Sequence, residues 1–513
     1  MPVTERAVRS KGRRGRGRPG ESRAVAPGPA YITRRIPYFE FLGEEGLARL
    51  EDQADWLIQE IGIEFRDDPE ALRIWRDAGA DVTETRVRLP RGAARELCKT
   101  APSKFTQHAR NPLRRVEIGE DCTVFAPVYG PPFVRDLEGG RRYGAFADLE
   151  KLVKLTYMLP ALHHSGLVTC EPCDLPVNKR HLDMLYAHIR WSDKPVLGAI
   201  TAKSRAEDSV AMMRILHGDD FVENNCVIMG NVNTNSPLLV DKVVTEAIRT
   251  YSAAGQGMIV APFILGGAMG PVTTAASIAQ ALAEAMICCA FAQLVRPGSP
   301  FVLGNFLSSM SLKSGAPTFG MPEPVASNYI IGQLARRLGV PLRCGGSLTA
   351  SKVTDAQAGT ESADSMHSTA LGGANFVLHA AGWLEGGLVT SFEKLIVDAD
   401  RLGAYQKLLG GVELDDNSLG RNAYDDVEPA GHFLGSAHTM GNYETAYYDA
   451  SMSNSESLEQ WEEGGAKDTE RRAYETWNKM LADYEAPALD PAADEALREF
   501  IARKKESMAD AWY

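Results

Sequence analysis

The feature that most constrains the fold is an eightfold alternation of β-rich runs and helical stretches after residue 120. Several runs are continuously apolar, which is typical of parallel strands buried on both faces. Eight such units favour a closed (β/α)₈ barrel, an α/β TIM barrel, over an open doubly wound sheet, and no GxGxxG motif follows the first run. The expected strands are 122–129, 162–171, 194–201, 224–231, 257–263, 300–306, 340–348 and 374–381. The expected helices are 147–159, 178–190, 204–217, 238–254, 274–295, 324–338, 357–372 and a stretch after 385.

The segments on either side of the repeat differ from it. Residues 31–120 have apolar residues mostly at helical spacing and predict an N-terminal helical cap before a barrel of residues 121–400. Residues 401–513 are polar and predict a C-terminal helical extension. Residues 1–30 are rich in Arg and Gly, so we expect a disordered basic tail, with an arm that binds a partner or nucleic acid as the alternative.

Composition narrows the class of protein. The chain has 513 residues, and its net charge of -12 argues against non-specific binding to nucleic acid. No window has the uninterrupted apolar length of a membrane span, so we expect no membrane. Eight cysteines are scattered among apolar runs, which indicates reduced thiols and a cytoplasmic location. Cys170 and Cys173 have CxxC spacing, but no second pair or nearby histidines complete a metal site, and we expect none.

The chemistry of a barrel is expected where its strands end. The predicted strand ends and following loops carry aromatic residues, amides and one carboxylate. Aromatic faces with few charges suit a methylated ammonium through cation–π contacts, although each ring alone could be ordinary packing. The candidate substrate-binding residues are Tyr129, Glu171, Asn231, Asn233, Phe263, Asn305, Phe306, Gln357 and Trp383.

The loop after the seventh predicted strand leaves two possibilities open. Asp355, Gln357 and Glu361 could cap the following helix, or they could line the mouth of the barrel. Gly266 and Gly267 follow the fifth strand, but no GK[ST] follows them, so a phosphate cradle is weakly indicated.

Motifs spread over residues 40–505 resemble the trimethylamine methyltransferase family. They are NTNSPL (233–238), GGAMGPVT (266–273) before AEA (283–285), QLVRPGSP (293–300), FGMPEP (319–324), GGSLTASKVTDAQAGTES (345–362), HAAGWLEGGL (379–388) and GHFLGSAHT (431–439). The resemblance implies a (β/α)₈ barrel that moves a methyl group from a methylated amine to a corrinoid protein. Founding members carry pyrrolysine, which this chain lacks, so it resembles the branch that acts on quaternary amines such as glycine betaine. Ala350 and Ser351 stand where the family often has an acidic residue, which leaves the substrate open.

The resemblance also implies a division of roles. A quaternary amine leaves as a neutral tertiary amine, so the protein needs only to hold the cation and aim one methyl group at Co(I), and no general base is required. Tyr129, Phe263, Phe306 and Trp383 would partly cage the cation, and Asn231, Asn233, Asn305 or Gln357 would bind a substrate carboxylate. His379 and Glu385 are the catalytic candidates, because they would orient the substrate or the docked partner. Loops expected to face the corrinoid contain Gly266, Gly267, Gly345, Gly346 and Asp355.

We therefore expect no tightly bound cofactor, a corrinoid supplied by a partner protein, and a homo-oligomer. Three alternatives stay open: methyl transfer directly to tetrahydrofolate, a lyase or hydrolase on the same barrel, and a betaine-binding protein without catalysis. A requirement for the corrinoid protein would exclude direct transfer to tetrahydrofolate. Dependence on a metal would favour a lyase or hydrolase, and betaine binding without turnover would favour a binding protein.

Overall fold

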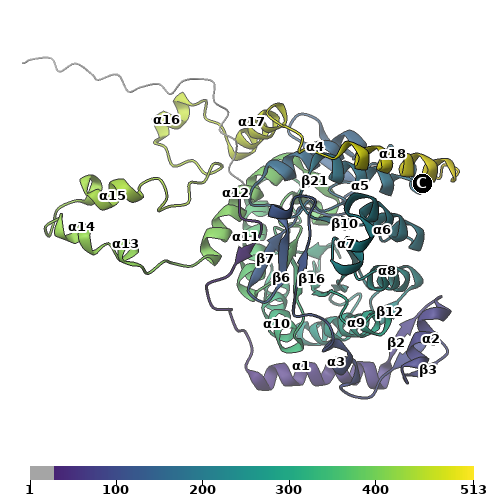
Figure 1. The fold of residues 1–513 in the computed structure, drawn as a ribbon. Coiled ribbons are helices and arrows are strands. Elements are labelled where there is room, and N and C mark those ends of the chain that lie inside the picture. The colour runs from purple at the N-terminus through teal and green to yellow at the C-terminus, as the bar shows by residue number, and fades with distance from the viewer. Residues whose placement is uncertain (1–27, 513) are drawn as a thin grey trace, which may run out of the picture.

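A computed structural model describes residues 28–512, so the expected basic tail lies outside the described residues except for 28–30. The chain has a mixed α/β fold around a large curled sheet, with helices on its outer side (Figure 1). Seven strands of this sheet are parallel, and the last of them, β19, pairs with the first, β7. Their residues are almost all buried, as the apolar runs predicted. In the order in which they pair they are β10 (Val196–Gly198), β11 (Ile228–Val232), β13 (Gly257–Val260), β15 (Phe301–Gly304), β18 (Leu342–Gly345), β19 (Phe376–Leu378) and β7 (Cys122–Phe125).

The expected second strand, 162–171, is not a regular strand. Its backbone still bridges its neighbours, because His163 N–H donates to Phe125 O at 2.9 Å and Gly166 O accepts from Leu197 N–H at 3.0 Å. The rings of His163 and His164 accept hydrogen bonds from the backbone N–H groups of Phe125 and Gly166. These side chains compete with a regular ladder, and Gly166 has a positive φ of 75°. A local side-chain network therefore interrupts the strand.

Helices follow the strands close to the expected positions. Six of them begin within two residues of the prediction, and α12 lies in the stretch expected after residue 385. Helix α8 begins four residues later than expected, after the N-cap Asp241. The helices are α4 (Phe146–Met158), α5 (Arg180–Trp191), α6 (Lys203–His217), α8 (Lys242–Ala253), α9 (Thr274–Val295), α10 (Pro322–Leu338), α11 (Ala356–Gly372) and α12 (Phe392–Leu409).

Among the described residues, α9 alone has the length and apolar composition of a helix that could cross a membrane. It is enclosed within the protein, where α8 and α10 pack beside it and helices of the N-terminal part cover it. Its burial inside the core accounts for its apolar composition.

The N-terminal part contains strands as well as helices. Helix α1 (Glu44–Trp56) continues into a π-helical turn, Leu57–Ile61, and is followed by α2 (Pro69–Asp77) and α3 (Ala93–Cys98). A small sheet joins β2 (Ile63–Phe65), β3 (Asp81–Thr83), β4 (Arg86–Arg88) and β12 (Leu239–Val240). Antiparallel strands β1 (Ile32–Thr33), β5 (Lys104–Gln107) and β6 (Val116–Gly119) extend the large sheet. The predicted cap thus has short strands that its helical spacing did not indicate.

Two small sheets stand beyond the carboxyl ends of the parallel strands. One consists of β14 (Phe263–Leu265), β16 (Phe306–Met310) and β17 (Pro317–Thr318). The other consists of β20 (Trp383–Leu384), β21 (Val389–Ser391), β8 (Phe133–Asp136) and β9 (Gly140–Tyr143). Three of the predicted aromatic residues lie on these sheets, so the sheets position the candidate site.

The C-terminal part has two regions. Residues 411–457 carry α13 (Asp416–Leu419), α14 (Arg421–Asp425) and α15 (Ala437–Asn442), and they project away from the body (Figure 1). After α16 (Leu458–Glu463), helix α17 (Thr469–Ala482) packs on α12 and α4, and α18 (Pro491–Glu506) packs on α5 and α6. Only the second region packs closely as an extension of the helical layer.

Candidate active site

An aromatic cluster lies at the carboxyl ends of the parallel strands. The ring centres of Phe263 and Phe306 are 5.1 Å apart, and those of Phe306 and Trp383 are 6.0 Å apart. The His379 ring is 4.4 Å from Trp383 and is stacked 5.6 Å from Phe306. Phe319, in the loop before α10, lies 5.8 Å from Trp383. Three of the four rings expected to cage a cation are thus in contact. Tyr129, the fourth, joins the cluster through its backbone.

Trp383 is fixed from two sides. Its indole Nε1–H donates to Thr349 O at 3.1 Å, and only 4% of the residue is exposed. The preceding Gly382 N–H donates to Asp398 Oδ2 at 2.9 Å, and Asp398 in turn is paired with the buried Lys394 at 2.5 Å. Gly387 has a φ of 98°, and a Cβ there would lie 2.4 Å from the indole ring. These contacts hold the indole in one orientation before any ligand arrives.

His379 is neutral and presents one N–H to the site. Its Nδ1 accepts a hydrogen bond from Tyr129 N–H at 3.2 Å, which assigns the ring proton to Nε2. Burial, and secondarily the charge of Arg343, hold the pKa of His379 well below its usual value. The backbone has a φ of 59°, a conformation that is uncommon for a residue with a Cβ. His379 can therefore donate a hydrogen bond but carries no charge at neutral pH.

Arg343, in the middle of β18, is a buried cation without an acidic partner. It is 1% exposed, and no carboxylate of residues 28–512 forms an ion pair with it. Its guanidinium carbon lies 5.0 Å from the centre of the Phe306 ring, Nη1 donates to Asn305 O at 3.2 Å, and Nε has no partner among the described residues. Burial lowers the pKa of Arg343 to about 10, so the group stays charged. A buried charge is ordinarily paired with an opposite charge. An anionic ligand would neutralise the buried guanidinium of Arg343.

The candidate amides have different surroundings. Asn231, on β11, is buried, and its Oδ1 has no hydrogen-bond partner among the described residues, whereas Asn233 is exposed. The Asn305 amide faces α10, where it donates to Ser327 Oγ at 3.1 Å and Asn328 Oδ1 at 2.9 Å. Its two donor hydrogens are thus used in packing, and of the three amides only Asn231 is both buried and unpaired.

The candidate carboxylates are engaged elsewhere. Glu171 pairs with Arg180 at 2.7 Å, and burial raises the pKa of Glu171. Glu385 pairs with Arg141 at 2.8 Å and is partly exposed. Neither carboxylate has a hydrogen bond or ion pair with a member of the aromatic cluster.

The loop before α11 caps that helix and braces the cluster. Asp355 is the N-cap, accepting from Ala358 N–H at 2.9 Å and Ser351 Oγ–H at 2.8 Å, and these bonds lower the pKa of Asp355. Gln357 is exposed and donates to Glu361 at 2.9 Å. Glu361 also accepts from the Thr349 hydroxyl at 2.7 Å, which links the helix to the residue that holds Trp383. Asp355 therefore caps α11, which is the first of the two roles considered for this loop, the other being to line the mouth of the barrel.

The glycines expected to face the corrinoid divide into two groups. Gly266 and Gly267 lie in a partly exposed turn closed by Gly267 N–H donating to Gly270 O at 3.0 Å. Gly345 and Gly346 are buried, and a Cβ on Gly346 would lie 2.5 Å from Ala380. A Cβ on Gly345 would lie 2.6 Å from the Leu348 side chain, so close packing where β18 ends requires glycine at both positions.

Sequence reasoning missed three residues that build this site: Arg343, Phe319 and Glu284. Glu284, on α9, is fully buried and accepts from Thr234 Oγ1–H and Ser236 Oγ–H at 2.6 Å each and from Leu238 N–H at 2.8 Å. It therefore fixes the loop after β11. A charged residue within an apolar helix or strand was the available signal for both Glu284 and Arg343.

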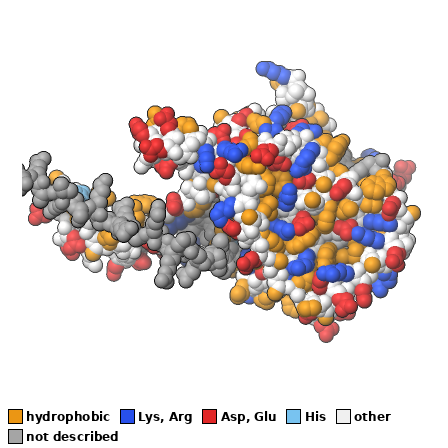
Figure 2. Space-filling view, turned by 90° about the horizontal axis from the view of Figure 1, so that it is seen from above, with side chains coloured by type: hydrophobic (Ala, Val, Ile, Leu, Met, Phe, Trp, Pro, Cys, Tyr) orange, Lys and Arg blue, Asp and Glu red, His pale blue; other side chains and the backbone are white. Residues whose placement is uncertain are grey.

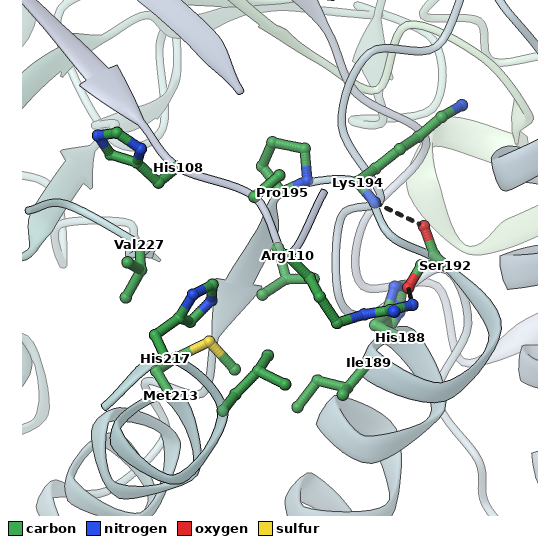
Figure 3. A pocket seen from close by; sticks show the side chains of 13 residues that line it. His108, Arg110, His188, Ile189, Ser192, Lys194, Pro195, Met213, His217 and Val227 are labelled. Carbon is green, nitrogen blue, oxygen red and sulfur yellow. Dashed lines mark hydrogen bonds between the residues drawn. The ribbon is translucent and has the colours of Figure 1, made fainter. Parts of the chain in front are cut away.

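A small cavity lies at the opposite, amino-terminal end of the strands. Its volume is about 10 Å³, and His108, Arg110, His188 and His217 line it (Figure 3). Lys194 also lies there, but its Nζ donates to the carbonyl oxygens of Thr156, Leu159 and Leu162 at 2.6–2.9 Å. This volume holds no more than about one water, and the contacts are those of a structural cap on α4.

Within residues 28–512, no group of three or more His, Cys, Asp or Glu side chains is placed to hold a metal ion. Cys170 and Cys173 of the CxxC spacing are free thiols, and burial raises the pKa of both. Two thiols without further ligands do not make the four-ligand site that structural zinc requires.

Comparison with known proteins places the chain in a family. The profile described as "Trimethylamine methyltransferase (MTTB)" matches residues 9–509. The chain belongs to the trimethylamine methyltransferase family. A glycine betaine methyltransferase of Desulfitobacterium hafniense (strain Y51) is 36% identical over 476 residues, which cover 93% of this chain and 99% of that relative. A proline betaine:corrinoid methyltransferase of Eubacterium limosum is 24% identical and covers 92% and 99% of the two chains. The monomethylamine methyltransferase (MtmB) of Methanosarcina barkeri matches in structure with a TM-score of 0.49 at 11% identity, over 88% and 90% of the chains.

Proposed function

We propose that this protein is a methyltransferase that moves a methyl group from a betaine to the reduced corrinoid of a partner protein. The observation that carries the proposal is the buried, unpaired Arg343 beside the aromatic cluster. An aromatic cluster suits a quaternary ammonium, and a buried guanidinium suits a carboxylate. A betaine has both groups, separated by a short carbon chain.

The two ends of the substrate would occupy different parts of the site. The carboxylate would pair with Arg343, and His379 Nε2–H would be a further donor, since the charge of Arg343 acts on His379. The trimethylammonium would lie against Phe306, Phe263 and Trp383, away from the guanidinium that repels it. The fixed guanidinium would orient the substrate, because the reversed pose would place the ammonium beside a like charge.

The transfer step needs little from the protein beyond this orientation. The bond between the methyl carbon and nitrogen breaks, and its electron pair stays on nitrogen, giving a neutral tertiary amine. The acceptor cobalt supplies the electron pair of the new bond, changing from Co(I) to Co(III). No proton moves, which agrees with a neutral His379 and with carboxylates that are paired elsewhere.

The names of the relatives support the same activity. The relatives include glycine betaine, proline betaine and L-carnitine methyltransferases, and the last two are named for transfer to a corrinoid. Each of these three donors combines a quaternary nitrogen with a carboxylate. We propose glycine betaine as the first donor to test, because the most similar of these relatives acts on it.

The finer architectural expectations are part of the proposal. We infer that segment 162–171 completes a closed (β/α)₈ barrel, since it bonds to strands on both sides. We keep 31–120, 121–400 and 401–513 as the three parts of the chain, and we expect a cytoplasmic homo-oligomer without a tightly bound cofactor. Glu385 and the loops with Gly266, Gly267 and Asp355 would contact the corrinoid protein.

The test is a methyl-transfer assay with purified protein, a corrinoid protein reduced to Co(I), and glycine betaine, choline or trimethylamine. The proposal expects methylcobalamin absorbance and dimethylglycine only with glycine betaine. Transfer to tetrahydrofolate without the corrinoid protein would favour the direct route. Betaine binding without any transfer would make the chain a binding protein.

A further inference from the structure

A projecting arm, residues 411–450, exposes many large apolar side chains. Val412 is 86% exposed and Tyr447 is 87% exposed, although both belong to a chain with an extensive buried core. An exposed apolar patch of this kind marks a binding surface. The other large apolar residues of the arm that are exposed are Leu414, Leu419, Tyr424, Phe433, Leu434, Met440, Tyr443 and Tyr448.

The arm is also strongly acidic. It contains eight Asp or Glu residues against one Arg, Arg421. In the part of the chain that the structure describes, only Glu413 of these carboxylates forms an ion pair, with Arg35 at 2.5 Å. Red carboxylate side chains are visible on the projecting part at the left of Figure 2, whereas the body mixes red and blue. Unpaired negative charge and exposed tyrosines together favour a basic, arginine-rich ligand.

A large cavity separates the arm from the body. Its volume is about 2370 Å³, and Glu413, Asp415 and His438 of the arm line it. Small-molecule sites measure about 300–1,000 Å³, so this space suits a polypeptide segment better. Gly28 and Pro29, where the described chain begins, lie in the same wall. The preceding 27 residues are therefore tethered at the cavity, and they hold eight Arg or Lys residues against two Glu.

We propose that the basic segment 1–27 docks on the acidic arm 411–450 of the same chain. Opposite charge provides the attraction, and arginine side chains can pair with the arm carboxylates and stack on Tyr424, Tyr443 or Tyr447. The tether raises the effective concentration of the segment to the millimolar range for a short linker, so weak pairwise contacts suffice. Docking would cover the exposed side of the arm.

The experiment is hydrogen exchange of the arm amides in the full chain. The test variant replaces Arg13, Arg14, Arg16 and Arg18 with Gln, and the matched control replaces the same four with Lys, which keeps the charge. Faster exchange of residues 411–450 in the Gln variant, but not in the Lys variant, is the expected result. About 0.5 M NaCl should have the same effect on the unmodified protein, because salt screens exposed pairs.

Two outcomes would overturn the proposal. Equal exchange of the arm in all three proteins would show that the segment does not cover it. Protection that rises with protein concentration, together with a larger mass by light scattering, would assign the cover to a second copy instead. The methyl-transfer assay gives an independent check that each variant is folded.

Discussion

Replacing Arg343 with Met separates ligand binding from stability. The guanidinium is 1% exposed, its Nε has no partner, and no described carboxylate neutralises it. Truncating one member of a buried charge pair costs about 2–5 kcal/mol of binding free energy. At about 1.4 kcal/mol per tenfold, the Kd for glycine betaine should rise from about 30-fold to several thousand-fold.

The same change should not destabilise the ligand-free protein. Replacing a buried ionic group with an apolar one of similar size is neutral or stabilising by about 1–4 kcal/mol. The hydrogen bond to Asn305 O is lost, which offsets about 1 kcal/mol of that gain. We therefore expect an unfolding free energy that is unchanged or higher.

Isothermal titration calorimetry and urea denaturation measure the two quantities. Arg343→Lys is the matched control, since it keeps the charge but loses the planar pair of donors. Choline, which has no carboxylate, should bind the Met variant no worse than it binds the unmodified protein. The reasoning is refuted if the Met variant binds glycine betaine within about threefold of the unmodified protein, or if it unfolds several kcal/mol more easily.

Three further predictions concern the aromatic cluster, the buried carboxylate and pH. Trp383→Ala should weaken glycine betaine binding by about 1–2 kcal/mol, whereas Trp383→Phe should lose less; equal affinity of all three proteins by calorimetry would contradict the aromatic contact. Glu284→Gln should lower the free energy of unfolding in urea by about 2–4 kcal/mol, because it leaves buried hydroxyl donors poorly matched; an unchanged midpoint would contradict this role. Burial holds the pKa of His163 and His164 at about 3 and that of His188 at about 4, below the usual 6.5. The unfolded chain then binds more protons in acid, so the melting temperature should fall as the pH drops from about 6.5 towards 3, and a constant melting temperature from pH 7 to 4 would refute this.

The repeat of strands and helices could be predicted because its signals are local and periodic. Helix α9 begins at the predicted residue 274, and α11 begins directly after its N-cap Asp355. The irregular segment 162–171 could not be predicted, because its shape depends on where the rings of His163 and His164 point. That choice is made by tertiary contacts, which outweigh the β propensity of the run.

The sequence predicted the kind of site, an aromatic cluster at the strand ends, better than it predicted which residues form it. The rule that function lies at strand ends found Phe263, Phe306 and Trp383, which the fold brings together. It passed over Arg343, which lies within an apolar run rather than at its end. It also selected Asn305, although alternation along a strand does not reveal which side chain faces a helix and which faces the interior.

The buried guanidinium and the aromatic rings of the candidate site belong to different sheets. Arg343 is part of a strand of the large sheet, while Phe263, Phe306 and Trp383 lie on short sheets added beyond it. Substitutions or insertions in those added sheets can reshape the aromatic cluster without moving the guanidinium, because β18 belongs to a different sheet. In the proposed binding mode, changes in these sheets would alter which ammonium group fits, while Arg343 would keep its contact with the carboxylate.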